Sequence, residues 1–195
     1  MENKVYFVPG FFRWLRALCL TGLFITGLSL TSTAQVTTNS GSGLAPSYSD
    51  LATAITALNG ATISSPVVIT LTANETAPAG GYSITAQGSS SNSIAIDGGG
   101  YIITANGTLT AGALNDALIK LVGADFVTIQ NFVLQENPAN TTTTAASNNM
   151  TEWGVALLYA STTNGASSNT IQNNTISLSR LYQNSFGIYA NATHS

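Results

Sequence analysis

The sequence has few of the residues that bring reactive chemistry or strong surface charge to a protein. It contains one cysteine and one histidine, and only 7% of its 195 residues are charged, against roughly a quarter in an ordinary globular domain. The charges form no basic stripe, no acidic tail and no heptads rich in Glu and Lys. These absences argue against nucleic-acid binding, a coiled coil and charge-driven disorder.

The amino terminus predicts export. Basic residues precede an uncharged run at 17–30, and the small residues 31–34 follow it, an order that is typical of a secretory signal peptide cleaved before Gln35. The run is shorter than the roughly 20 residues that span a bilayer, so we expect no membrane span in the mature chain. We predict a signal peptide at 1–34 and a secreted or cell-surface location.

Cleavage of this signal peptide changes which reactive and charged side chains the protein contains. The only cysteine, Cys19, lies within it, and the mature chain keeps two basic residues, Lys120 and Arg180, against seven acidic ones. The mature chain must therefore hold itself together without disulfides or thiolate metal sites. Polyanionic ligands gain little attraction from such a surface.

The first part of the mature chain changes character near residue 47. Residues 35–46 are Thr, Ser and Gly with no hydrophobic period, which predicts a flexible leader, and we expect the folded domain at 47–195. The segment 47–60 predicts one short amphipathic helix, with Asp50 as a candidate first-turn residue. Its apolar residues have helical spacing: Leu51, Ala54, Ile55 and Leu58. A helix this short needs an apolar surface to lie on.

The rest of the chain predicts short strands. Hydrophobic stretches of a few residues are broken at close intervals by Gly, Asn, Ser and Asp, which leaves no room for the crossover helices of an α/β fold. We therefore predict the all-β class. The expected strands are 67–71, 82–85, 93–96, 101–104, 118–122, 126–129, 132–135, 155–159, 170–171, 175–178 and 186–190.

An imperfect repeat favours a solenoid among the all-β folds. Each repeat has a strand that ends in Ile, then a polar residue, then Gly or Asn, at 93–98, 126–131 and 169–174. A second strand follows each one, at 101–103, 132–134 and 176–178. The repeat predicts that Ile96, Ile129 and Ile171 lie above one another in successive coils. Gly or Asn at the corner is suited to a left-handed bend, and stacked Asn side chains are expected to hydrogen-bond between coils.

These motifs resemble a known family. Ile129-Gln130-Asn131-Phe132 and the segment 171–176 resemble coil motifs of right-handed parallel β-helix, pectin-lyase-like proteins, and 49–60 followed by 67–71 is similar to the capping helix and first strand of exported bacterial members. The resemblance implies a right-handed parallel β-helix with a short N-terminal capping helix. It also implies that enzymes of this kind use acidic clusters, often with calcium, and Arg or Lys as a base, or a carboxylate pair.

The mature chain offers little of that chemistry. Asp97 and Asp125 are its best acid pair, but both lie in turn sequences. Lys120 is expected to point outward from a strand and Arg180 to follow a strand end, while His194 has no partner at metal-ligand spacing. We assign no catalytic residue, no metal ligand and no cofactor, and we lean against enzymatic activity in this segment.

Aromatic residues are the remaining candidates for ligand contact. Trp153 follows a long polar excursion and sits beside Glu152, an arrangement that predicts an aromatic platform and an acceptor at the lip of a cleft. Tyr159, Tyr182 and Tyr189 are further residues with rings able to stack on sugars. The candidate ligand-binding set is Trp153, Glu152 and Tyr159; the alternative is that these rings pack inside the fold.

We therefore expect a secreted or cell-surface scaffold that contacts polysaccharide or adheres to a host or matrix surface. One alternative is the amino-terminal part of a polysaccharide lyase or glycoside hydrolase whose catalytic coils lie beyond Ser195. Another is a β-sandwich adhesion module, which requires antiparallel hairpins. The strand at 186–190 lies near the end of the sequence without a cap, which predicts missing C-terminal coils or a capping partner.

Overall fold

Short strands dominate the domain. The computed structural model describes residues 33–191 apart from 108, 111, 113–115 and 145, so most of the predicted signal peptide lies outside the described residues. The helices are η1, a 3-10 helix (Gly41–Gly43), and α1 (Leu51–Gly60). The strands are β1 (Val36–Thr38), β2 (Ser47–Tyr48), β3 (Val67–Leu71), β4 (Glu75–Thr76), β5 (Tyr82–Ile84), β6 (Ile94–Asp97), β7 (Ile102–Thr104), β8 (Ala117–Val122), β9 (Val127–Gln130), β10 (Val133–Gln135), β11 (Trp153–Leu158), β12 (Thr170–Gln172), β13 (Thr175–Ser177) and β14 (Phe186–Asn191).

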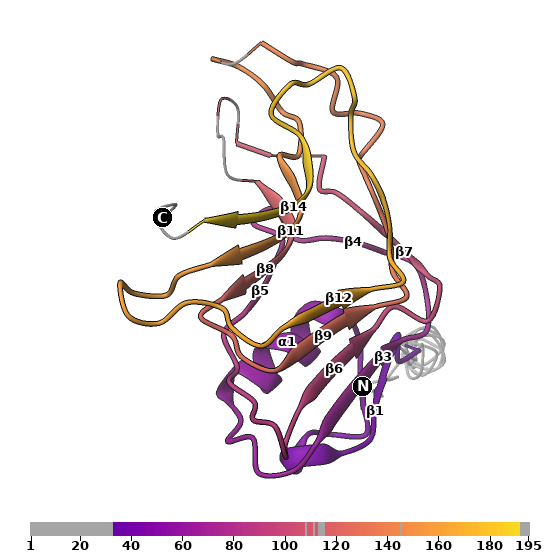
Figure 1. The fold of residues 1–195 in the computed structure, drawn as a ribbon. Helices are drawn as coiled ribbons and strands as arrows, with labels where there is room; N and C mark the ends of the chain where they lie inside the picture. The colour runs from indigo at the N-terminus through magenta and orange to yellow at the C-terminus, as the bar shows by residue number, and fades with distance from the viewer. Residues whose placement is uncertain (1–32, 108, 111, 113–115, 145, 192–195) are drawn as a thin grey trace, which may run out of the picture. The chain divides into compact units, whose positions relative to one another are not determined.

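The strands form three sheets that the chain visits in a fixed order. Sheet A has the order β12-β9-β6-β3-β1-β2, sheet B β13-β10-β7-β4 and sheet C β14-β11-β8-β5 (Figure 1). From β3 onward the chain passes through A, B and C four times, and we call each passage a round. Every strand pair between rounds is parallel. The all-β prediction holds, and the parallel pairing contradicts the hairpins of the sandwich alternative.

The predicted stacking of isoleucines is confirmed. In sheet A, Ile96 pairs with Ile129, and Ile129 pairs with Ile171. Ile69 extends this ladder by pairing with Ile96 from the first round. The first three side chains are fully buried in the main core, whereas Ile171 in the fourth round is only partly buried. Aliphatic burial in register is thus what aligns the rounds.

The register in sheet B differs from the expected alignment. Leu134 pairs with Ile176, whereas the repeat predicted residues 176–178 opposite 132–134, which would pair it with Leu178. The observed register places the sheet B core position five positions after the ladder position in both rounds, with four residues between them. The pairing therefore keeps the same number of residues at the corner between sheets A and B in both rounds. It does not align the hydrophobic residues 176–178 with residues 132–134 as the repeat predicted.

Two of the three corners between sheets A and B use the left-handed residue that the repeat predicted, whereas at the first corner Gly99 and Gly100, and not Gly98, are left-handed. Asn131 and Asn173 adopt left-handed conformations, with φ of 59° and 55°. Asn174 also links two rounds, because its Oδ1 accepts from the Phe132 amide (2.9 Å) and its Nδ2 donates to the Ile129 carbonyl (2.9 Å). Side-chain hydrogen bonds between rounds therefore add to the backbone pairing, but these run from an Asn side chain to backbone groups and not between stacked Asn side chains.

The segment 35–46 is not the flexible leader that its composition predicts. Strand β1 pairs antiparallel with both β2 and β3, and Val36 is buried. Asn39 fixes the following turn, because its side chain donates to the Pro66 carbonyl and accepts from the Val68 amide, each at 3.0 Å. Val and Thr favour strands, so a polar composition alone does not exclude a strand that pairs on both sides.

The predicted helix is present but shorter, because Ser47–Tyr48 forms β2. Helix α1 begins after Asp50, whose Oδ1 accepts from the Thr53 amide at 2.7 Å. The four apolar residues that the spacing predicted are buried in the main core. Asn59, near its end, donates to the Ser83 carbonyl and accepts from the Thr85 amide, each at 2.8 Å. The helix is thereby attached to the first round.

Candidate functional site

The structure does not bring the three predicted ligand-binding residues together. Trp153 and Glu152 are buried, whereas Tyr159 is 42% exposed. The Trp153 ring stacks on Tyr189, with ring centres 4.2 Å apart and an angle of 4° between the planes. It belongs to a small apolar cluster separate from the main core. The prediction of a Trp153 platform at a cleft lip is therefore wrong, and the packing alternative is correct.

Glu152 is buried and forms hydrogen bonds that connect separate segments of the fold, so it is not an acceptor at the surface. Its Oε2 accepts from the Asp116 amide (2.9 Å), its own amide donates to the Asp116 carbonyl (3.1 Å), and its carbonyl accepts from the Phe186 amide (2.7 Å). Burial raises the pKa of its carboxyl to about 7; a hydrogen bond to Tyr182 lowers it, and the Asp116 charge raises it further. Glu152 therefore connects three rounds, and its carboxyl is only partly ionised at neutral pH.

The carboxyl groups of Glu152 and Asp116 also include buried oxygen atoms that accept no hydrogen bond among the described residues. Glu152 Oε1 and Asp116 Oδ2 have no hydrogen-bond partner within the described part of the chain. Burial also raises the pKa of Asp116; Lys120 lowers it and Glu136 raises it. Buried acceptors without donors destabilise a fold when they are ionised. The arrangement suits a protonated carboxyl better than a carboxylate.

The two aspartates that formed the best acid pair serve in turns. Asp97 accepts from the Gly99 amide and the Gln130 side chain, each at 2.8 Å, and from Asn131. Burial raises the pKa of Asp97, but these hydrogen bonds outweigh it and leave the pKa below its ordinary value. Asp125 Oδ1 accepts from the amide and the hydroxyl of Ser167, at 2.8 and 2.6 Å. Among the described residues, Asp125 is the one acidic side chain of the hollow that it lines, and Asp97 lines neither of the two hollows described below.

Two other predicted residues keep modest roles. Lys120 is half-buried on β8, and Arg180 lines a hollow at the last round. His194 lies outside the described residues.

Tyr159 lies at a polar hollow that the sequence did not predict as a unit. The hollow has a volume of about 410 Å³ and is formed by the turn after β11 together with one residue that precedes β9. We call it the Tyr159 hollow. Its lining residues are Asp125, Tyr159, Thr162, Thr163, Asn164, Gly165, Ala166 and Ser167.

Local contacts hold the ring of Tyr159 in place. The Ala160 amide donates to the Asn164 carbonyl (2.8 Å), and the Asn164 amide donates to the Ser161 carbonyl (3.1 Å), which closes a tight turn. A Cβ on Gly165 would lie 2.8 Å from the Tyr159 ring, so only glycine allows the ring to pack this closely. The phenol is therefore fixed on one side and open to solvent on the other.

The chemistry of the Tyr159 hollow is that of a polar binding site. The Asp125 Oδ2 accepts no hydrogen bond in the part of the chain that the structure describes. The Asn164 amide and two threonine hydroxyls line the same space. An aromatic ring beside several donors and acceptors suits a ligand with a partly apolar face and several hydroxyls.

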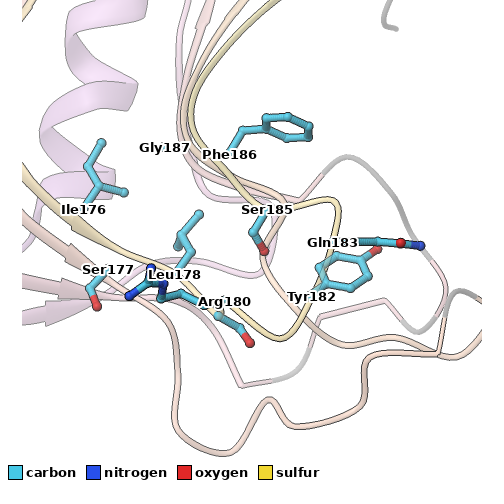
Figure 2. A pocket seen from close by; sticks show the side chains of 10 residues that line it. Ile176, Ser177, Leu178, Arg180, Tyr182, Gln183, Ser185, Phe186 and Gly187 are labelled. Atoms are coloured by element: carbon cyan, nitrogen blue, oxygen red, sulfur yellow. The ribbon is translucent and has the colours of Figure 1, made fainter.

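A second and larger hollow lies at the last round. It has a volume of about 660 Å³ and is lined by residues from β13, β14 and the segment that joins them. Figure 2 shows Ile176 and Leu178 projecting from one segment and Phe186 from another. Phe186 and Ile188 of β14 are both about half exposed. This hollow therefore lies beside the half-exposed strand β14 of the fourth round.

Other functional features are absent from the described part of the chain. In residues 33–191, excluding the gaps given above, no three His, Cys, Asp or Glu side chains are grouped so that they could bind a metal ion. No helix there has the length and apolar character needed to cross a membrane. No protein-family model matches the chain, and no curated protein or solved structure matches it.

Proposed function

We propose that this chain is a secreted or cell-surface scaffold, built as a right-handed parallel β-helix of the pectin-lyase-like kind, that contacts neutral carbohydrate through the Tyr159 hollow. The observation that carries the proposal is the solvent-facing Tyr159 ring held over Gly165 beside Asp125 and Asn164. The predicted signal peptide supports export of the chain.

The strand order supports the β-helix part of the proposal. Four rounds through three parallel sheets, with an isoleucine ladder between them, are the pattern expected when identical coils stack along one axis. The proposed hand follows from the strong general preference for right-handed connections between parallel strands.

Charge supports a neutral ligand. The mature chain has two basic residues against seven acidic ones, and the Tyr159 hollow contains Asp125 and no cationic side chain. A polyuronate would meet repulsion there. A neutral sugar has hydroxyls for the Asp125 and Asn164 oxygens, and a face of C–H groups for the Tyr159 ring.

Binding is better supported than cleavage. Hydrolysis of a glycosidic bond generally uses two carboxyl groups placed on either side of it. The Tyr159 hollow has one acidic side chain among its lining residues, and that group accepts two hydrogen bonds from Ser167. An adhesive or carbohydrate-contacting role fits this geometry.

Affinity electrophoresis through gels that contain neutral polysaccharides tests the proposal. We expect retardation of the wild-type chain, and a loss of about tenfold or more in affinity for Tyr159→Ala, since one stacked aromatic is worth more than 1 kcal/mol in many binding sites. Tyr101→Ala is the matched control: Tyr101 is 38% exposed, close to the value for Tyr159, but follows β6 at another corner.

Gly165→Ala provides a second variant, which displaces the Tyr159 ring without removing it. Reduced retardation is expected for this variant as well. The proposal fails if no neutral polysaccharide retards the wild-type chain, or if Tyr101→Ala weakens binding as much as Tyr159→Ala.

A further inference from the structure

Asp125 places a carboxylate in the Tyr159 hollow, and no cationic side chain lines that hollow with it. Its Oδ1 accepts from the amide and the hydroxyl of Ser167, whereas its Oδ2 accepts no hydrogen bond from the described residues. The two basic residues of the mature chain lie elsewhere, since Lys120 is on β8 and Arg180 lines the larger hollow. One oxygen of a negatively charged group is therefore available to a ligand.

Backbone contacts fix the position of Asp125. Its carbonyl accepts from the Gly88 amide at 2.9 Å, and the next amide, that of Phe126, donates to the Ser167 carbonyl at 3.2 Å. Phe126 is left-handed, with φ of 54°. A bulky residue keeps this conformation only where the surrounding contacts impose it, and such residues cluster at ligand sites. The fold thus sets the place of the carboxylate without help from a ligand.

The Tyr159 ring supplies a second group that attracts positive charge. A cation is stabilised above the face of an aromatic ring, and the Tyr159 side chain is 42% exposed although it packs against Gly165. The turn that carries the ring is seated on the segment before Asp125, because a Cβ on Gly123 would lie 2.7 Å from the Asn164 Nδ2. A carboxylate and an aromatic ring therefore line one hollow in a fixed arrangement.

We propose that the Tyr159 hollow prefers sugars that carry a protonated amine over the same sugars without charge. The ammonium group donates a charge-assisted hydrogen bond to Asp125 Oδ2 and lies beside the Tyr159 ring. Thr162, Thr163 and Asn164 line the same space and suit the hydroxyls of the sugar. The acidic surface that disfavours anionic sugars attracts cationic ones. The preference rests on the proposed carbohydrate role of this hollow and extends it from neutral sugars to amino sugars.

Calorimetric titration of the full chain with two matched tetrasaccharides tests this preference. One is a glucosamine tetramer, and the other is the same tetramer after N-acetylation, which removes the charge and keeps the sugar chain. At mildly acidic pH and low salt, we expect the amine form to bind about tenfold more tightly, because a cation–π contact and an ion pair each add a factor of a few at exposed sites. Added salt should reduce this ratio, since it screens exposed charges.

Asp125→Asn removes the charge and keeps an oxygen that can accept from Ser167. This variant is expected to bind the two tetramers with nearly equal affinity. Asp97→Asn is the matched control, because it removes the same charge from a turn residue that lines neither hollow. It is expected to keep the wild-type ratio, which separates the site from the general attraction of an acidic protein for a cationic sugar.

Thr162→Lys gives a second test that leaves Asp125 in place. Thr162 is exposed and lines the hollow, so the new ammonium group is expected to pair with Asp125 and to abolish the preference. Circular dichroism that matches the wild type would show that each variant is folded.

The outcomes separate this inference from the proposed neutral ligand. If the acetylated tetramer binds and the amine form binds no more tightly, neutral carbohydrate binding stands and the inference fails. If the amine form binds and no neutral sugar does, the inference stands and the neutral ligand fails. No binding of the amine form, a preference that survives Asp125→Asn, or an equal loss in Asp97→Asn would overturn the inference. Equally tight binding of a lysine tetrapeptide, which has amines but no sugar hydroxyls, would overturn the amino sugar as the ligand.

Discussion

The first and the fourth rounds differ in how completely their core residues are covered. At the first round, α1 and β1 cover the core, and Ile69 is fully buried. At the fourth round, nothing among the described residues covers the core, and Ile171 in the same ladder is only partly buried. The same residue type at the same register position therefore contributes differently to stability according to its distance from the open end.

This difference shows how a stacked fold distributes its stability. Among the described residues, each round pairs its strands only with the rounds beside it, and if the proposed solenoid is correct its total stability is close to a sum of contributions from neighbouring rounds. A round with two neighbours buries both faces of its core residues, and a round with one neighbour buries one. In this chain the fourth round, which has one neighbour among the described residues, is thus expected to unfold before the inner rounds.

The largest expected effect comes from truncating the buried part of the ladder. Ile129→Ala should lower the free energy of unfolding by about 3 to 4 kcal/mol, because it removes buried methyl groups and leaves a cavity. Ile171→Ala should cost about 1 kcal/mol, because its side chain is only partly buried. Urea unfolding followed by circular dichroism measures both. Equal losses would contradict the contrast between the two ends.

The next effect concerns pH and Glu152, which joins the third round to the exposed fourth. Burial raises the pKa of Glu152 above its ordinary value of 4.5 to about 7, so the folded state retains a proton that the unfolded state releases. The stabilisation from this retained proton is fully present when the pH is below 4.5, the ordinary pKa. It is lost as the pH rises through the folded-state pKa of about 7. The loss is on the order of 3 kcal/mol between about pH 4.5 and pH 7.5.

Replacing the Glu152 carboxyl tests whether this group causes the decline in the free energy of unfolding with pH. Glu152→Gln should flatten the decline of the free energy of unfolding over this pH range. Tyr182→Phe should move the decline to higher pH, since the hydrogen bond from Tyr182 lowers the Glu152 pKa. Urea titrations at a series of pH values give the comparison. An unchanged decline in Glu152→Gln would show that another group is responsible.

The smallest expected effect lies at the capped end. Asp50→Ala removes the side chain that accepts from the Thr53 amide at the start of α1, which should cost about 1 kcal/mol. Burial raises the Asp50 pKa, but hydrogen bonds from Thr53 and Ser49 outweigh it and lower the pKa below its ordinary value. The contribution is therefore present above that ordinary value and lost as the pH falls.

Ser49→Ala is the control for this prediction, because Ser49 donates only to the Asp50 carboxylate and caps no backbone group itself. Thermal unfolding near neutral pH should separate the two variants. A cost for Ser49→Ala equal to that for Asp50→Ala would count against the helix cap as the cause.

Local sequence patterns predicted much of this fold. The repeat identified the isoleucine ladder, because a residue that must be aliphatic in every round leaves a periodic trace. Helical spacing identified the buried face of α1, and Asn at the corners identified left-handed turns at Asn131 and Asn173. Strands β1, β2 and β4 were missed, because two or three residues with mixed polarity carry no period.

The candidate site was less predictable. Whether Trp153 faces solvent depends on segments distant in the sequence, including Tyr189, which stacks on its ring. Tyr159 is exposed, as a ligand-contacting ring must be, but the Asp125 that lines the same hollow comes before β9 and is joined to the turn through Ser167. Gly165 after Asn164 was the one local signal for a close approach by a ring. The spacing of residues along the sequence does not show which side chains are covered by distant segments.

Nuclear Overhauser contacts among isoleucine methyl groups test the stacking of rounds most directly. In a protein labelled at the isoleucine δ1 methyls, we expect contacts between Ile69 and Ile96, between Ile96 and Ile129, and between Ile129 and Ile171, since neighbouring strands lie about 4.8 Å apart. No contact is expected between Ile69 and Ile171, which three strand spacings separate. Absence of the Ile96–Ile129 contact, or a direct contact between Ile69 and Ile171, would contradict the account.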